Sequence, residues 1–408
     1  MRIGRTLPPA AAPIGMGSLA SGFAGLLSGR RELDRFQREL KQHFGVKHCF
    51  LVSSGQAAFT LILLALKQLS PERDEVLIPA FTCYSVPASI VRAGLRVRLC
   101  DVRADSFDFD YAQLASLSTA KMLAAVPTHL FGVPADVPGL RQRLRDPDIA
   151  IVEDAAQAMG EAGDGGKLGT LGDVGFFSLG RGKALSCVEG GIILTNRDDI
   201  AKGLSGILPR LPRYGMASLL ALIFKATALV LLIRPWLFWL PRSLPFLKLG
   251  ETLFDPRVPI RRMSSFQAGL ARNWRHKLQE MREVRSRNVT RWIAAIGAAG
   301  QDGSHLSNGR VLGLPRLPLR IKATEARESL LRESAVRGLG IMPAYPTSIA
   351  AIPELKGTFG DAAFPVAERS ARELVTLPTH EYLTEDDVCG VGRLVCRALG
   401  GSRLVKQP

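Results

Sequence analysis

Short apolar runs alternate with segments of helical spacing along the first half of the chain. The runs are rich in Val, Ile and Leu and have the length of buried strands. Because strands that alternate with helices pair in parallel, the pattern predicts an α/β fold with a mostly parallel central sheet sandwiched by helices. The predicted strands span residues 49–52, 76–78, 97–99, 122–126, 150–152, 174–177 and 192–194, and the predicted helices span 32–44, 57–67, 85–93 and 137–145.

The pattern changes after residue 206. The next segment is rich in Pro, Leu and Trp, and after it Ser264 or Ser265 can cap one long helix. From about residue 310 short strands and helices mix, as in a smaller C-terminal α+β domain. The predicted parts are an N-terminal arm lying on the body or on a partner subunit (1–30), a large domain (31–206), an apolar insert and connection (207–260), and the long helix with the small domain (261–408).

The segment 216–240 is apolar and long enough to span a bilayer. However, Lys225 and Arg234 interrupt it, and Pro235 breaks a helix near its end. We therefore expect an apolar helical insert rather than a membrane span. Burial against the body or a subunit interface is the favoured interpretation, and contact with a membrane surface through 216–247 is the alternative.

Charge narrows the classes of partner. The chain has 408 residues, 47% of them hydrophobic, and a net charge of +16, which favours anionic partners. No nucleic-acid-binding module is visible, so phosphorylated substrates or an anionic membrane surface remain. The six cysteines show no metal-binding spacing and favour a reducing compartment. Pro8, Pro9 and Pro13 argue against a signal peptide, so we expect a cytoplasmic protein, with the inner membrane face as the alternative.

Candidate chemistry gathers behind two predicted strands. Asp154 follows the strand 150–152, Ser178 follows 174–177, and Lys183 comes five residues after Ser178. A carboxylate, a hydroxyl and an amine near strand ends are what a pyridoxal phosphate (PLP) site needs. Alone, each has a simpler reading: Lys183 as a solvated charge, and Asp154 as a helix N-cap whose capping box Gln157 closes.

Two further segments follow predicted strands. Gly55 lies in a turn before an apolar helix, where backbone N–H groups and the helix dipole form a phosphate cradle. The simpler reading of this turn is an ordinary capped helix start. His129 follows the strand 122–126, where a histidine is more often a structural hydrogen-bonding residue than a catalyst.

A series of motifs carries a resemblance. In order they are SSGQAAFTLILLAL, VLIPAFTCYSVPASIVRAG, THLFGVPAD, EDAAQAMG, GTLGDVGFFS, RMSSFQAGL, LGIMPAYP and LVTLPTHEYLTEDDV. With Lys183 and EGG behind Ser178, the series resembles the DegT/StrS-type sugar-nucleotide aminotransferases, which are PLP enzymes of the aspartate-aminotransferase fold, fold type I. The resemblance runs from about residue 30 to the C-terminus, and several motifs in a fixed order are more specific than any one.

The resemblance implies roles for single residues. Lys183 would form the Schiff base with PLP, and Asp154 would pair with the pyridinium nitrogen. Cys83, with Tyr84 beside it, stands where the family packs a side chain on the ring. The remaining implied cofactor contacts are Gln157 at the ring, and Ser178, Gly55 and Gln56 at the phosphate.

The sequence also departs from the family pattern. Gln56 stands where the family has Thr, and Val188 replaces the first Gly of its G-E-G-G. The family's Asn-x-Arg segment, which reaches the neighbouring subunit's phosphate, becomes Ile260-Arg261-Arg262. The apolar insert lies outside the usual pattern.

The resemblance implies transfer of an amino group from an amino acid, glutamate in the family, to a keto sugar nucleotide in polysaccharide or glycoconjugate biosynthesis, by a homodimer without a metal. Family members that dehydrate sugars replace the lysine with histidine, so Lys183 disfavours that activity. A second alternative is a non-catalytic relative that acts as a binding or regulatory protein, or at a membrane surface. Retention of Asp154, Ser178 and Lys183 disfavours it.

Overall fold

A seven-stranded sheet forms the centre of the computed structural model, which describes residues 3–244, 250, 252–297 and 312–400. The strand order is β1-β9-β8-β5-β4-β2-β3, and only β9 runs antiparallel to its neighbours. Every predicted strand is confirmed to within one or two residues at each end. The strands are β1 (His48–Val52), β2 (Glu75–Pro79), β3 (Arg96–Cys100), β4 (Met122–Ala125), β5 (Ala150–Asp154), β8 (Val174–Ser178) and β9 (Gly191–Thr195).

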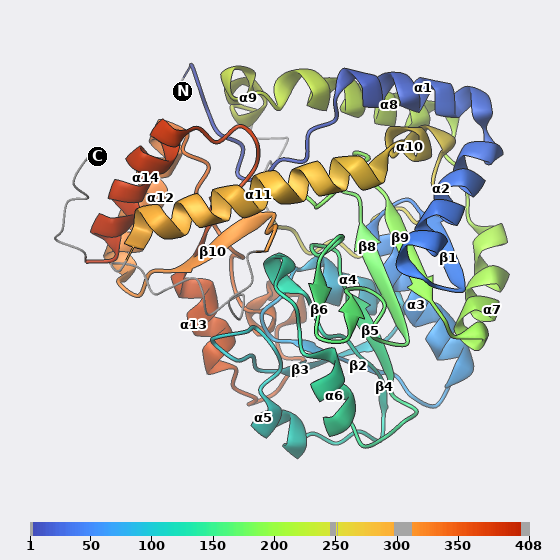
Figure 1. The fold of residues 1–408 in the computed structure, drawn as a ribbon. Helices are drawn as coiled ribbons and strands as arrows, with labels where there is room; N and C mark the ends of the chain where they lie inside the picture. The colour runs from blue at the N-terminus through green and yellow to red at the C-terminus, as the bar shows by residue number, and fades with distance from the viewer. Residues whose placement is uncertain (1–2, 245–249, 251, 298–311, 401–408) are drawn as a thin grey trace.

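Helices cover both faces of this sheet (Figure 1). Alternate residues of one strand face opposite layers: Ile193 packs with α3, α4 and α7, whereas Ile192 and Leu194 pack with α2, α10 and α11. The sheet is therefore buried on both sides, which explains why its strands are continuous apolar runs. The covering helices include α2 (Arg30–Phe44), α3 (Gly55–Leu69), α4 (Ser85–Arg92), α5 (Tyr111–Ser116), α6 (Val137–Arg143) and α7 (Asp198–Ile207), and a small hairpin joins β6 (Ala162–Gly163) to β7 (Gly166–Lys167).

The C-terminal part has its own antiparallel sheet, in the order β10-β12-β11. Helices pack beside it, and its apolar cluster joins the end of α11 to the small sheet. This is the mixed α+β arrangement expected for the tail. Its elements are β10 (Arg316–Arg320), α12 (Thr324–Arg337), β11 (Met342–Pro343), α13 (Pro365–Glu373), β12 (Leu374–Pro378) and α14 (Glu385–Ala398).

The single long helix expected after Ser264 is wrong. Ser264 caps a short helix, α10 (Ser265–Leu270), through a complete capping box with Gln267. The chain then turns through Asn273, which has a left-handed backbone (φ 57°), and α11 (Trp274–Ile296) begins. The helical spacing of apolar residues continues across the break, so the pattern concealed it.

The N-terminal segment is more ordered than an arm. It contains a helix, α1 (Met16–Ser28), that crosses α10 closely. A Cβ atom on Gly25 would lie 2.4 Å from the Ser265 carbonyl oxygen, so only glycine permits this approach. The preceding residues 3–15 run over the body of the same chain, with Leu7 and Ala11 almost fully buried.

The apolar insert forms two helices, α8 (Met216–Leu232) and α9 (Pro235–Arg242). The predicted break at Pro235 is confirmed, because Arg234 is extended between the helices. One face of α8 is buried against the body through Leu222, Ala226 and Val230, and the opposite face is exposed. Within the described residues, no helix is both long and apolar enough to cross a membrane. Residues 245–247 of the suggested membrane contact lie outside the described residues.

Candidate active site

Asp154 and Lys183 lie at the same edge of the central sheet. Asp154 ends β5, and β5 pairs in parallel with β8, which ends at Ser178. The loop after β8 carries Lys183 back toward Asp154, and each charge influences the ionisation of the other. The sheet therefore brings together the amine, carboxylate and hydroxyl that the sequence singled out, at the strand ends where ligands bind in such folds.

Burial dominates the ionisation of both groups. It lowers the pKa of the Lys183 amine, and the charge of Arg316 lowers it further, although Cys83 and Asp154 act in the opposite direction. The neutral, nucleophilic amine is thus favoured more than in a solvated lysine.

Burial raises the pKa of Asp154, and the Ala156 N–H, Lys183 and His129 oppose the rise. One carboxylate oxygen accepts the Ala156 N–H at 3.0 Å. The other accepts no hydrogen bond from a described residue, so a cationic N–H there would stabilise the carboxylate. The helix-cap interpretation of Asp154 is wrong, since turns rather than a helix follow it.

The start of α3 lies against Ser178. A Cβ atom on Gly55 would be 2.7 Å from the Ser178 Cβ, so glycine is required for this approach. Ser54 caps the helix by accepting the Ala57 N–H at 3.0 Å, as in an ordinary capped helix start. The ordinary cap is therefore present, and the phosphate cradle stays a prediction. The side chain of Gln56 donates to the Asp255 carbonyl oxygen at 2.7 Å instead of turning toward Ser178.

The candidate ring contacts separate into two groups. Cys83 and Gln157 line a cavity beside Lys183. Tyr84 is almost fully buried, and its hydroxyl is held by the Thr347 hydroxyl and by the Thr347 N–H at 2.9 Å. Of the two residues at the predicted stacking position, Cys83 is therefore the one that faces the cavity.

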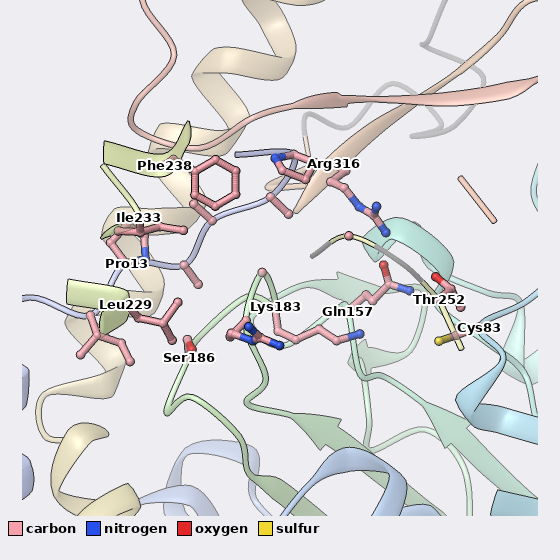
Figure 2. Close-up of a pocket in the computed structure, with 18 of the residues that line it drawn as sticks. Pro13, Cys83, Gln157, Lys183, Ser186, Leu229, Ile233, Phe238, Thr252 and Arg316 are labelled. Carbon is pink, nitrogen blue, oxygen red and sulfur yellow. The ribbon is translucent and has the colours of Figure 1, made fainter. Parts of the chain in front are cut away.

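The cavity has a volume of about 350 Å³. Figure 2 shows the Lys183 side chain extended along its floor toward Gln157 and Cys83, with Arg316 reaching in from above. Tyr345 also lines it and accepts a hydrogen bond of 3.2 Å from Gln157 Nε2. The sequence prediction missed Arg316 and Tyr345, because they lie far along the chain from Lys183. Tyr345 stands in the motif LGIMPAYP, which was the only local signal for it.

His129 has a structural role, which is the interpretation that the sequence favours. Its Nε2 donates to the Glu153 carboxylate at 2.9 Å, and its Nδ1 accepts the Ala135 N–H at 2.9 Å. Glu153 is fully buried and also accepts backbone N–H groups, including that of Gly169 at 2.8 Å. This pair anchors the loop after β5 beneath the site without reaching the cavity.

The family model of the DegT/DnrJ/EryC1/StrS aminotransferases matches residues 21–218 and 260–395. The chain belongs to this family. Aminotransferases of this family use PLP. Family membership therefore confirms both the resemblance and the expected cofactor. The match omits residues 219–259, which hold most of α8 and all of α9.

Several relatives act on sugars. The GDP-perosamine synthase of Caulobacter vibrioides is 34% identical over 171 residues, 42% of this chain and 46% of that protein. A UDP-N-acetyl-3-dehydro-alpha-D-glucosamine 3-aminotransferase of Acidithiobacillus ferrooxidans is 32% identical over 164 residues, 40% of this chain and 44% of that protein. The chain thus spans about half the length of these curated relatives.

Solved structures confirm the fold. The aminotransferase PseC of Helicobacter pylori superposes with a TM-score of 0.77 at 15% identity, covering 97% of this chain and 100% of that one. The GDP-4-keto-6-deoxy-D-mannose-3-dehydratase of E. coli, solved with hydrated PLP, gives 0.74 at 18% identity over 96% and 100%. The predicted fold of PLP-dependent transferases is therefore the fold of this chain.

Proposed function

We propose that this protein is a PLP-dependent aminotransferase that moves an amino group from an amino acid, glutamate by resemblance, to a keto sugar nucleotide in polysaccharide or glycoconjugate biosynthesis. One observation carries the proposal: the half-buried Lys183 and the buried Asp154 carboxylate lie at one edge of the sheet and influence each other's charge. Beside them, the close contact of Gly55 with Ser178 leaves the N-terminus of α3 open to a phosphate.

The residues present fit PLP. The open oxygen of Asp154 suits a pyridinium N–H, Lys183 suits the aldehyde, and Ser178 with the start of α3 suits the phosphate. When bound, the cofactor supplies an electron sink that stabilises negative charge on the substrate's α-carbon. We assign Cys83 and Gln157 to the sides of the ring, because both line the cavity around Lys183.

Each residue then has a task in the reaction. The lowered pKa of Lys183 favours an uncharged Nζ, which can accept a proton from the α-carbon of the donor. The same group can give a proton back in the half of the reaction that aminates the acceptor. Asp154 holds a proton on the ring nitrogen by charge pairing. Arg316 presents a cation to the cavity, which favours a carboxylate or phosphate group on the substrate.

Two rival functions are disfavoured by Lys183. The dehydratase relatives fold similarly, but a histidine in place of the lysine is the feature that the resemblance assigns to them. A regulatory role has a precedent in name, since the pleiotropic regulatory protein of Geobacillus stearothermophilus is 31% identical over 169 residues. A protein with a purely regulatory role would have no need to keep this lysine, carboxylate and phosphate cradle together.

We further propose that the protein is a homodimer. We also propose that it is cytoplasmic, with a peripheral contact to the inner face of the membrane as the alternative. The segment that replaces Asn-x-Arg lies beside the cradle, because the Arg261 N–H donates to the Ser53 hydroxyl at 3.0 Å. The Arg261 guanidinium lies 5.3 Å from the Tyr214 ring centre, and Arg262 donates to the Pro209 carbonyl. Exposed Phe224 and Trp236 on the insert support the membrane contact.

Borohydride trapping tests the proposal. The purified protein, saturated with PLP and reduced, should carry the pyridoxyl group on Lys183 in peptide mass mapping. The Lys183→Ala variant should lose the absorbance band of the Schiff base between PLP and the lysine. The exposed control Lys202→Ala should keep this band. Addition of glutamate should then change the absorbance of the cofactor. A modified lysine elsewhere, or none, would contradict the assignment.

A further inference from the structure

Residues that the family match omits, in α8 and α9, form one wall of the cavity beside Lys183. Leu229 of α8, Ile233 at its end and Phe238 of α9 all line this cavity. Figure 2 shows the three apolar side chains on one side and Gln157 on the other, with Lys183 between them. The insert is therefore part of the candidate active site as well as a cover on the outside of the fold.

The N-terminal arm completes this apolar side through Pro13 and Ile14. Hydrogen bonds fix the arm along its length: the Thr6 N–H donates to the Pro235 carbonyl of the insert at 2.8 Å. Nearer the cavity, His380 Nε2 donates to the Pro8 carbonyl at 2.7 Å, and Arg285 to the Ala11 carbonyl at 2.9 Å. The wall is thus a built surface held by both domains.

The cavity also has a polar and cationic lining. Arg181 and Arg316 both line it, and the Arg316 guanidinium points toward Gln157 in Figure 2. No carboxylate of the described residues pairs with either guanidinium. A ligand that fills the cavity therefore meets the reactive lysine, unpaired positive charge and an apolar wall at the same time.

We propose that the α8–α9 insert is the acceptor-recognition element of the enzyme, and that the acceptor carries an apolar group in addition to its keto sugar and phosphates. This inference rests on the proposed function. The apolar group would lie on Leu229, Ile233 and Phe238, while Arg181 and Arg316 neutralise the phosphates. Two chemistries provide such a group: the nucleobase of a sugar nucleotide and the isoprenoid chain of a lipid-linked sugar diphosphate.

The same insert provides a matched control. Leu220 and Leu231 lie on the outer face of α8, and 58% and 51% of their surfaces are exposed. Substitution of these two by serine changes the helix as much as substitution of Leu229 and Ile233. Only the second pair, however, faces the cavity.

Calorimetric titration of the PLP-saturated protein tests the inference, because the phosphate cradle is then filled. The probes are guanosine diphosphate, farnesyl diphosphate and inorganic pyrophosphate. We expect one of the first two to bind at least about tenfold more tightly than pyrophosphate, since an apolar pocket contact contributes on this scale. The preference should fall about tenfold in Leu229→Ser/Ile233→Ser, and should stay within about twofold in Leu220→Ser/Leu231→Ser, because those side chains contact solvent.

A second variant guards against misfolding. Ile233→Trp fills the cavity instead of opening it and should also abolish the preference, with the cofactor's absorbance as the check on folding. Binding of guanosine diphosphate identifies a nucleobase, and binding of farnesyl diphosphate identifies a lipid chain. Equal binding of pyrophosphate, or a preference that survives in both wall variants, overturns the inference. Failure of glutamate to change the cofactor's absorbance would instead overturn the proposed function.

Discussion

The backbone carbonyl of Lys183 accepts a hydrogen bond of 2.8 Å from the guanidinium of Arg285, more than one hundred residues further along the chain. Arg285 comes from the middle of α11, is 1% exposed, and also donates to the carbonyls of Ala184 at 3.3 Å and Ala11 at 2.9 Å. Burial lowers its pKa to about 10, so it remains charged at neutral pH. One buried cation therefore joins the Lys183 loop to the N-terminal arm.

Arg285→Met should destabilise the protein and disturb the site together. Three backbone carbonyls lose their donor, and a buried acceptor left without a partner costs roughly 1–3 kcal/mol. We expect the free energy of unfolding in urea to fall by about 3 kcal/mol or more, and the absorbance of bound PLP to titrate at a different pH. Arg285→Lys keeps the charge and should recover part of both effects.

The control is Arg287→Met, two residues along on the exposed side of α11. It should change the free energy of unfolding by no more than about 0.5 kcal/mol. If Arg285→Met behaves like this control, Arg285 does not position the lysine loop.

Asp154→Asn should keep PLP bound and reduce amino transfer by orders of magnitude. The amide preserves the shape and the hydrogen bond to the Ala156 N–H, but it cannot hold the ring proton by charge pairing. Cofactor content and the rate of the glutamate-dependent absorbance change measure the two effects separately. Near-native rates, equal to those of the exposed control Asp148→Asn, would show that Asp154 only stabilises its turn.

Val188 occupies a position where the family has glycine, and the structure shows the consequence. Its φ is 70°, a left-handed backbone that is strained for a β-branched residue. Both Val188→Ala and Val188→Gly remove the buried side chain, but only glycine relieves the strain. We expect Val188→Gly to be more stable than Val188→Ala by about 1 kcal/mol, although glycine normally lowers stability relative to alanine. Thermal unfolding of the two variants compares them directly, and the opposite order would refute the strain.

The strands could be predicted because a doubly covered sheet demands continuous apolar runs, as in 192–194. Helix α1 could not be predicted from the sequence, because Gly22 and Gly25 are poor helix formers. These glycines are needed only for the close crossing with α10. The break at Asn273 could not be predicted either, because the apolar residues keep their helical spacing across it.

Within the candidate site, spacing behind two neighbouring strands was enough to select Asp154, Ser178 and Lys183. Nothing local marks Arg316 or Arg285. On a helix rich in charged residues, Arg285 looks like any solvated arginine until the fold places it over the Lys183 loop. Similarly, the insert is recognisable as apolar, but the sequence does not show that its inner face lines the cavity beside Lys183.

His380 should make the protein less stable in mild acid. It is fully buried, and burial lowers its pKa to about 4, with the charge of Arg285 acting in the same direction and the Pro8 carbonyl and Asp387 opposing. The neutral ring donates from Nε2 to Pro8 and accepts the Tyr382 N–H at Nδ1, so the fold requires one uncharged tautomer.

The unfolded chain binds a proton at this histidine below a pH of about 6.5, whereas the folded chain does so only below about 4. Between these values the unfolded state holds more protons, so stability falls as the pH falls. At pH 5 the loss from this residue is about 2 kcal/mol relative to pH 8. His380→Gln keeps a donor to the Pro8 carbonyl but cannot titrate. Urea unfolding at the two pH values should therefore show a smaller loss in this variant by about 2 kcal/mol, whereas the exposed control His276→Gln should match the unaltered protein. An equal loss in all three would show that other groups govern the acid response.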